Sequence, residues 1–278
     1  RPVNVTITRK GIGGPSSAYP TVGQSALERF WNRLYDERRV VGPGEQAHLD
    51  PDLVYLAAPD GSLVHAIYDI ETDGPLEIAF VADDDFFRFL EPYLDLYEDM
   101  VRPVGERMRG TFPTSERYIK LRVGDTPVSF SFAGNQPPDL YLWGTDGVDG
   151  SPRQNYGNYG VTYHIDVLME VTEPRRIRLY LGPEYTNAGT CVLAPALLLT
   201  DGAHDDDAES GRVVRLPASS RAVDARFIGE TVVLPGEPRV VRFDFMPPGG
   251  SCLPALLFAD VQAISPEEAK AWYAEHGN

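Results

Sequence analysis

Hydrophobic and polar residues alternate at the start of the chain and through most of its second half. Val3, Val5 and Ile7 are separated by single polar residues, and this period of two predicts a half-buried β-strand. Apolar segments separated by glycine and proline recur after residue 117, which predicts a mainly β fold, either a β-sandwich or a jelly roll. The segments are 118–123, 128–132, 140–143, 161–171, 176–181, 192–199, 231–234, 240–245 and 256–261.

Helical spacing is found in three places, which predicts a few peripheral helices. Leu27 and Phe30 lie on the apolar face of an amphipathic segment at residues 25–38. Residues 84–100 follow a run of aspartates, and residues 266–275 follow a serine and begin with proline and two glutamates. Carboxylates and serine favour helix starts because they satisfy unpaired amides. Between the first two helices, a meander of short strands is predicted at 53–57, 63–68 and 76–81.

These patterns divide the chain into four parts. Residues 1–10 form an N-terminal strand, residues 11–23 a glycine-rich linker, residues 24–262 a β-rich body and residues 263–278 a C-terminal helix. A division of the body near residues 110–117 stays open.

The N-terminal strand has two interpretations. Val3, Val5 and Ile7 can pair within their own domain. Alternatively, the linker can carry them to a neighbouring molecule, where they would act as a donor strand that completes its sheet.

Composition and the start of the chain indicate which partners and which cellular location to expect. The chain has 41 acidic and 25 basic residues and a net charge of −16, which disfavours nucleic acid and anionic lipid surfaces. The apolar run 191–199 is about half the length of a membrane-spanning helix, so no membrane insertion is expected. The chain starts with Arg1, which we interpret as a mature, secreted or cell-surface protein whose signal peptide has been removed.

The two cysteines, Cys191 and Cys252, have similar surroundings. Each follows small residues and begins an apolar run. A disulfide between them would close a loop of about 60 residues, and the chain-entropy estimate for that is roughly 4 kcal/mol. Two buried free thiols are the alternative.

Oxygen-rich loops are the candidate metal sites. Asp146 and Asp149 lie on a loop with two Asp-Gly turns, and such loops at the ends of β-sandwiches can hold Ca²⁺. The spacing is not that of an EF-hand, and turn chemistry alone also explains the loop. A second acidic stretch, residues 204–209, is interpreted mainly as a solvated loop. No cofactor other than calcium is suggested.

Aromatic residues next to the Asp-Gly loop suggest a carbohydrate ligand. Tyr141, Trp143, Tyr156 and Tyr159 cluster there, although most aromatic residues in strands are packed. No Gly-x-Ser-x-Gly, His-Glu-x-x-His, P-loop or dinucleotide fingerprint occurs, so the protein is not predicted to be an enzyme.

Five segments of the second half have a distinctive composition: Gly157-Asn-Tyr-Gly-Val-Thr-Tyr-His-Ile, Arg178-Leu-Tyr-Leu-Gly-Pro, Asn187-Ala-Gly-Thr, Leu234-Pro-Gly-Glu and Phe245-Met-Pro-Pro-Gly-Gly-Ser-Cys-Leu-Pro. Through these segments, residues 155–262 resemble an uncharacterised β-sandwich region of secreted Gram-positive bacterial proteins. That region often occurs beside a stalk module described as copper amine oxidase N-terminal-like. The resemblance implies a secreted or cell-surface β protein and no particular chemistry. Copper amine oxidase activity is excluded because Asn155-Tyr and Asn158-Tyr are both followed by glycine and the histidines are scattered.

Two functions follow from these features. The first is a structural subunit of an extracellular assembly or filament, whose partners are further copies of itself or other surface proteins joined by β-strand addition. The second is a monomeric extracellular module that binds carbohydrate or calcium.

Overall fold

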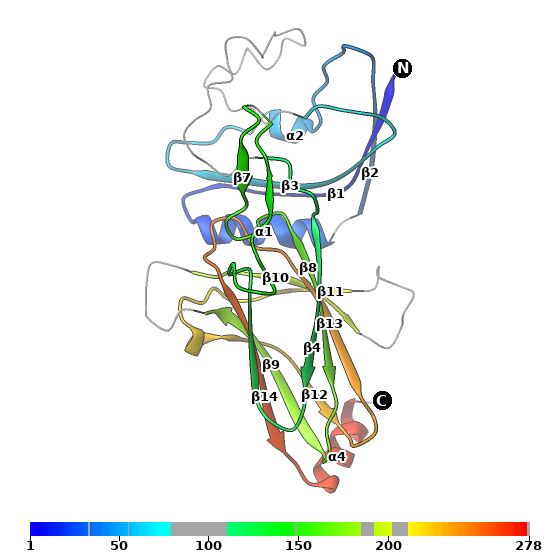
Figure 1. Ribbon diagram of the computed structural model, residues 1–278, viewed down its shortest axis with the longest axis vertical. Helices are drawn as coiled ribbons and strands as arrows, with labels where there is room; N and C mark the ends of the chain where they lie inside the picture. The colour runs from blue at the N-terminus through cyan, green and yellow to red at the C-terminus, as the bar shows by residue number, and fades with distance from the viewer. Residues whose placement is uncertain are drawn as a thin grey trace.

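The structure is a computed structural model that describes residues 1–32, 34–54, 56–78, 110–147, 149–184, 192–201 and 211–276. It is mainly β, as expected (Figure 1). The strands are β1 (Val3–Ser16), β2 (Leu34–Val41), β3 (Leu63–Thr72), β4 (Glu116–Val123), β5 (Val128–Phe132), β6 (Trp143–Thr145), β7 (Pro152–Gln154), β8 (Thr162–Met169), β9 (Arg175–Pro183), β10 (Ala196–Asp201), β11 (Arg212–Arg215), β12 (Arg226–Val233), β13 (Arg239–Phe245) and β14 (Ala255–Ala263). The helices are α1 (Tyr19–Asn32), α2 (Pro51–Val54), the 3₁₀ turn η3 (Ala222–Asp224) and α4 (Pro266–His276).

Two sheets form a β-sandwich that makes up most of the second half of the chain. One sheet has the order β11-β10-β13-β8-β4 and the other has the order β12-β9-β14-β5. All pairs are antiparallel except β4 with β8. Along β8, every second residue is buried, because one face of the sheet meets the core and the other meets solvent. The core is formed by inward-facing side chains of both sheets, among them Tyr163, Ile165, Val167, Ile177, Leu179, Leu181, Phe243 and Leu257.

The N-terminal part forms a separate three-stranded antiparallel sheet in the order β2-β1-β3, with α1 packed on it. Gly11 and Gly13 of β1 allow this packing. A Cβ atom at Gly11 would lie 1.9 Å from the carbonyl oxygen of Ala26, and one at Gly13 would lie 2.0 Å from that of Val22. Glycine is therefore needed at both positions for the strand and the helix to approach so closely.

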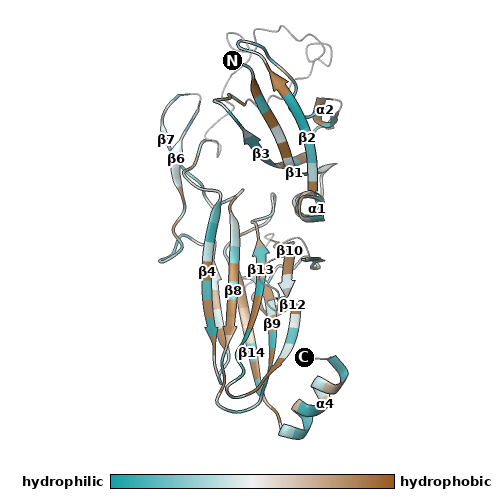
Figure 2. Ribbon diagram, turned by 90° about the vertical axis from the view of Figure 1, so that its right-hand side faces the viewer, coloured by the Kyte–Doolittle hydropathy of each residue, from teal (hydrophilic) through white to brown (hydrophobic). Residues whose placement is uncertain are grey.

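Helix α1 lies between the N-terminal sheet and the sandwich (Figures 1 and 2). Its Leu27, Phe30 and Trp31 form a hydrophobic cluster with Ala196 and Leu198 of β10 and with Met246. The opposite side of α1 packs on β1 and β3. The helix thus uses two faces, which joins the two β units through buried apolar surface.

Several predicted boundaries in the first part of the chain differ from the structure. Residues 11–16 continue β1 where a linker was expected, and the helix expected at 25–38 begins at Tyr19 and ends at Asn32. Residues 34–41 are a strand because they pair with β1. Of the expected meander, residues 63–72 form a strand, whereas residues 51–54 are helical and residues 76–78 have no regular structure. The helix expected at 84–100 lies outside the described residues.

The expected donor strand pairs within its own chain. β1 is the central strand of its sheet, with β2 on one edge and β3 on the other. Val5 and Ile7 are buried, and Val3 is partly buried. Because both edges of β1 are occupied, the expectation that it leaves its own body for a neighbouring molecule is corrected here.

The C-terminal helix is confirmed. Pro266 occupies the first helical position of α4. The Ser265 amide donates to Glu268 Oε2 at 2.8 Å, and the Glu268 amide donates to Ser265 Oγ at 3.2 Å. This reciprocal arrangement is a capping box, which satisfies two amides at the helix start.

Candidate functional site

A small β-hairpin extends from the end of the sandwich nearest α1 (Figure 2). Its strands β6 and β7 are antiparallel, with Trp143 opposite Gln154. The Asn155 amide donates to the Leu142 carbonyl at 2.8 Å, which continues the pairing by one residue. Thr111 joins the other edge through two backbone hydrogen bonds with Thr145, of 2.8 and 3.0 Å. The outer edge of β6 is therefore paired as well as its inner edge.

One face of this hairpin carries aromatic side chains. Successive residues of a strand point to opposite faces, so Tyr141, Trp143 and the opposite Gln154 share a face. Tyr156, in the turn after β7, joins them through its ring contact with Tyr141, and we call this surface the aromatic face. Trp143 and Tyr156 are 61% and 60% exposed. The rings of Tyr141 and Tyr156 meet edge to face, with centroids 6.0 Å apart. Three of the four aromatic residues singled out in the sequence therefore form one surface.

Tyr159, the fourth predicted aromatic residue, belongs to a different environment. Its hydroxyl donates to the Ser251 carbonyl at 2.6 Å. Its backbone amide and carbonyl bond to the side chain of Asn155 at 3.0 and 2.8 Å. Tyr159 therefore connects the root of the hairpin to the loop before β14 and is not part of the aromatic face.

The root of the hairpin contains a buried polar network. Asn158 is fully buried and has a φ of +50°. Its Oδ1 accepts from the Leu142 amide at 2.9 Å, and its Nδ2 donates to the Tyr163 hydroxyl at 2.8 Å. The Tyr163 hydroxyl lies 3.2 Å from both carboxylate oxygens of Asp139. The Asn158 amide donates to the Asn155 carbonyl at 3.0 Å and the Val161 amide to the Asn158 carbonyl at 3.1 Å, so two tight turns lead into β8.

Electrostatics favour a protonated Tyr163 in this network. Burial, together with the nearby charge of Asp139, raises the pKa of the Tyr163 hydroxyl. A protonated hydroxyl can donate to Asp139 while it accepts from Asn158. Arg117 pairs with the same carboxylate. Each strong polar group at the root therefore has a partner, which fixes the position of the hairpin.

The predicted calcium ligands are paired with an arginine. The Asp146 carboxylate is fully buried and lies 3.1 Å from Arg153 Nε, and the Asp149 carboxylate lies 3.3 Å from Arg153 Nη2. Asp149 also accepts from the amide and hydroxyl of Ser151, at 2.9 and 2.5 Å. The guanidinium, which the sequence reasoning did not consider, supplies positive charge to both carboxylates.

Among the described residues, no group of three or more His, Cys, Asp or Glu side chains could hold a metal ion. The acidic stretch at 204–209 lies outside the described residues.

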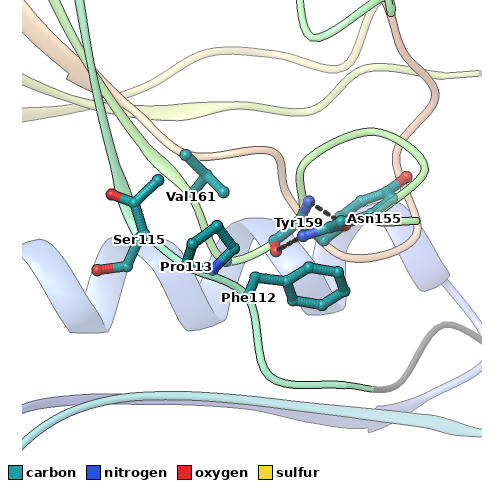
Figure 3. Close-up of a pocket in the computed structure, with 8 residues that line it drawn as sticks. Phe112, Pro113, Ser115, Asn155, Tyr159 and Val161 are labelled. Atoms are coloured by element: carbon teal, nitrogen blue, oxygen red, sulfur yellow. Dashed lines mark hydrogen bonds between the residues drawn. The ribbon is translucent and has the colours of Figure 1, made fainter. Parts of the chain in front are cut away.

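A pocket of about 380 Å³ lies at the root of the hairpin (Figure 3). Asn155 lies on the face of the hairpin opposite the aromatic face, and its amide is already bonded to Tyr159. The remaining lining residues are mainly apolar or small: Phe112, Pro113, Thr114, Ser115, Gly160 and Val161.

A second cluster crosses the solvent-facing side of the larger sheet. Tyr118, His164 and Asp244 are aligned on neighbouring strands. His164 Nδ1 lies 2.8 Å from Asp244 Oδ1, and this hydrogen bond raises the pKa of His164. The Tyr118 ring stacks on the imidazole, while its hydroxyl donates to Glu116 at 3.0 Å. Because the hydroxyl is directed to a carboxylate, the cluster does not form a nucleophile relay.

Only one of the two cysteines can be placed. Cys191 lies outside the described residues. The Cys252 amide donates to the carbonyl of Val192, the residue after Cys191, at 2.9 Å. The two segments therefore run side by side at this point, and the disulfide stays a prediction.

Comparison with known proteins yields little similarity. No family model and no curated protein matches the chain, so the resemblance of residues 155–262 to a secreted bacterial β-sandwich rests on the sequence segments alone. One solved structure that matches is the pre-peptidase C-terminal domain of a collagenase from Bacillus anthracis. It is 10% identical, with a TM-score of 0.24, over 51% of this chain and 94% of that one. Such a low TM-score does not establish a shared fold.

No helix among the described residues is long and apolar enough to cross a membrane.

Proposed function

We propose that the protein is a secreted or cell-surface β-sandwich module that binds carbohydrate through the aromatic face of the β6–β7 hairpin. The observation that carries the proposal is the exposure of Trp143 and Tyr156, 61% and 60%, on one face of a braced hairpin. Aromatic rings provide flat apolar surfaces for the C–H faces of sugar rings. The Gln154 amide on the same face can donate to and accept from hydroxyl groups.

The net charge narrows the class of sugar. With −16 at neutral pH, the protein repels polyanions. We therefore expect neutral or amino-sugar polysaccharides as ligands, and weak or no binding to sulfated or uronic acid polymers.

This module is favoured over the filament subunit because of where β1 lies. Strand addition requires a strand with free backbone groups, and β1 is paired along both edges. Size-exclusion chromatography of the native protein should show a particle of the monomer mass, 30.7 kDa. Polymers at this step would favour the assembly function instead.

The binding proposal is tested by co-sedimentation with insoluble cellulose, chitin and peptidoglycan, and by calorimetry with soluble xylan and β-glucan. Trp143→Ala and Tyr156→Ala should each weaken binding by roughly tenfold or more, as expected for loss of an aromatic anchor. The matched control is Tyr118→Ala, which removes a tyrosine that is 74% exposed on another surface and should leave binding unchanged. If no polysaccharide binds, or if the hairpin variants bind as well as the control, the proposal is wrong.

A further inference from the structure

The N-terminal sheet contains a buried lysine next to a buried aspartate. Lys10 lies on the central strand β1, and its side chain is only 9% exposed. Its ammonium nitrogen, Nζ, lies 2.8 Å from Glu37 Oε1, 3.1 Å from Asp52 Oδ2 and 3.5 Å from Asp50 Oδ1. The Tyr35 ring covers the ammonium group, with its centroid 5.0 Å away. The amine is thus held within reach of a carboxyl group and away from solvent.

The aspartate is fixed as firmly as the lysine. The Asp50 side chain is 1% exposed. Its Oδ2 accepts a hydrogen bond of 2.8 Å from the Tyr68 hydroxyl, and its Oδ1 accepts one of 2.9 Å from the Asp52 amide. Donors on both oxygens withdraw electron density from the carboxyl carbon, and they would stabilise negative charge on the oxygens during an addition.

The presence of lysine, and not arginine, at buried position 10 is unusual for this chain. The chain has 22 arginines and 3 lysines, and arginine suits a buried ion pair better because its guanidinium offers more donors and is weakly hydrated. Lysine instead has a primary amine, which can form an amide once it is deprotonated. The position that carries this buried cation therefore has the chemistry for a covalent bond.

We propose that Lys10 and Asp50 are joined by an intramolecular amide bond that forms after folding. Glu37 takes a proton from the ammonium group, and the neutral Nζ adds to the carboxyl carbon of Asp50. The Tyr68 hydroxyl stabilises the negative charge that develops on Oδ2. Oδ1 receives two protons that the ammonium group has lost, passed through Glu37, and leaves as water. The ammonium and carboxylate charges are both lost, one C–N bond replaces one C–O bond, and no other reactant is needed.

The charges around Lys10 determine its protonation state before the reaction. Burial lowers the pKa of Lys10, but the hydrogen bonds that its ammonium group donates to Glu37 and Asp52, together with the charge of Asp50, outweigh burial and raise the pKa overall. The resting state is therefore the ion pair, and the proton acceptor Glu37 becomes necessary. Bond formation would remove a charged pair from a buried site and fasten the loop after β2 to the central strand.

The decisive measurement is the intact mass of the full chain, purified natively and then denatured. We expect a mass one water molecule below that of the sequence, after any disulfide has been reduced. Tryptic digestion should leave the bond after Lys10 uncut and give a branched peptide that contains Lys10 and Asp50. Wild-type protein that keeps the full sequence mass after prolonged incubation at neutral pH would overturn the proposal, and no variant is needed for that result.

Variants separate the roles of the residues. Lys10→Arg keeps the charge but cannot form the amide, so it should have the full sequence mass. Asp50→Asn should form the same bond with loss of ammonia, and Glu37→Gln should slow the loss of water at least tenfold. The control is Asp36→Ala, since the Asp36 side chain is 66% exposed and pairs with Arg38 instead of Lys10; it should still lose water. Water loss that persists in Lys10→Arg would refute the assignment.

Discussion

Replacing Gln24 by methionine should weaken the junction between the N-terminal sheet and the sandwich. Gln24 lies on α1 and is 3% exposed. Its Nε2 donates to the carbonyls of Pro195 and Leu216 at 2.9 and 2.6 Å, and its Oε1 accepts from Arg215 Nε at 2.8 Å. Methionine has nearly the same volume, so the substitution removes the hydrogen bonds and leaves little cavity.

The magnitude follows from what each partner loses. The carbonyl of Pro195 still accepts from the Leu216 amide at 3.1 Å, and Arg215 still reaches Glu28 at 3.1 Å. The carbonyl of Leu216 loses its bond to Gln24. A buried polar group without a partner costs about 1–3 kcal/mol, and an ordinary hydrogen bond contributes about 1 kcal/mol. We therefore expect the free energy of unfolding to fall by about 2–4 kcal/mol.

Urea denaturation, followed by tryptophan fluorescence and by far-ultraviolet circular dichroism, measures this change. Trp31 on the same helix reports on the junction. The matched control is Gln262→Met on the exposed end of β14, which should change stability by less than about 0.5 kcal/mol. If Gln24→Met were as mild as the control, the assignment of the junction to these hydrogen bonds would be wrong.

Three further predictions concern separate parts of the molecule. Non-reducing mass spectrometry should find a Cys191–Cys252 disulfide, and Cys252→Ser should lower the free energy of unfolding by roughly 4 kcal/mol; two free thiols would contradict this. Because the folded pKa of His164 is raised, its contribution to stability should be fully present below the unfolded pKa of about 6.5 and should be lost as the pH rises through the folded pKa. Asp244→Asn should remove that dependence in urea titrations between roughly pH 5.5 and 8. Arg153→Ala leaves a buried carboxylate without its guanidinium and should lower the melting temperature by several degrees, for about 1–3 kcal/mol; Ca²⁺ that raises the melting temperature of the wild type but not of an Asp149→Ala variant would restore the predicted metal site.

The sandwich could be predicted because several of its strands alternate between more buried and less buried residues over their whole length. β8 buries every second side chain along its length, and every second side chain of β13 is more buried than its neighbours, so period two alone identifies both strands. β2 could not be predicted in this way. Leu34 and Tyr35 continue the helical spacing of α1, and β2 is strand because its backbone pairs with β1. The secondary structure of residues 34–41 therefore depends on tertiary pairing, which the local spacing of apolar residues does not predict.

Only part of the candidate site could be predicted, because its geometry also depends on strand pairing. The aromatic residues are visible as residue types, but which of them share a face depends on the hairpin register that pairs Trp143 with Gln154. β7 is only three residues long and contains proline and arginine, so its sequence has no pattern that predicts a strand. The pairing of Arg153 with both aspartates follows from the same register, because only the hairpin brings these side chains together.

In the proposed function, the residues that stabilise the hairpin differ from those that would bind the ligand. Asn158 and Tyr163 are fully buried and each has hydrogen-bond partners, so they fix the backbone. Trp143 and Tyr156 are mostly exposed and bury too little area to account for the presence of large rings. Single exposed aromatic residues are common on protein surfaces, but aromatic residues gathered on one face mark an interaction site. A rigid root below an exposed aromatic face is the arrangement expected of a preorganised binding surface, because little conformational entropy is then lost when a ligand binds.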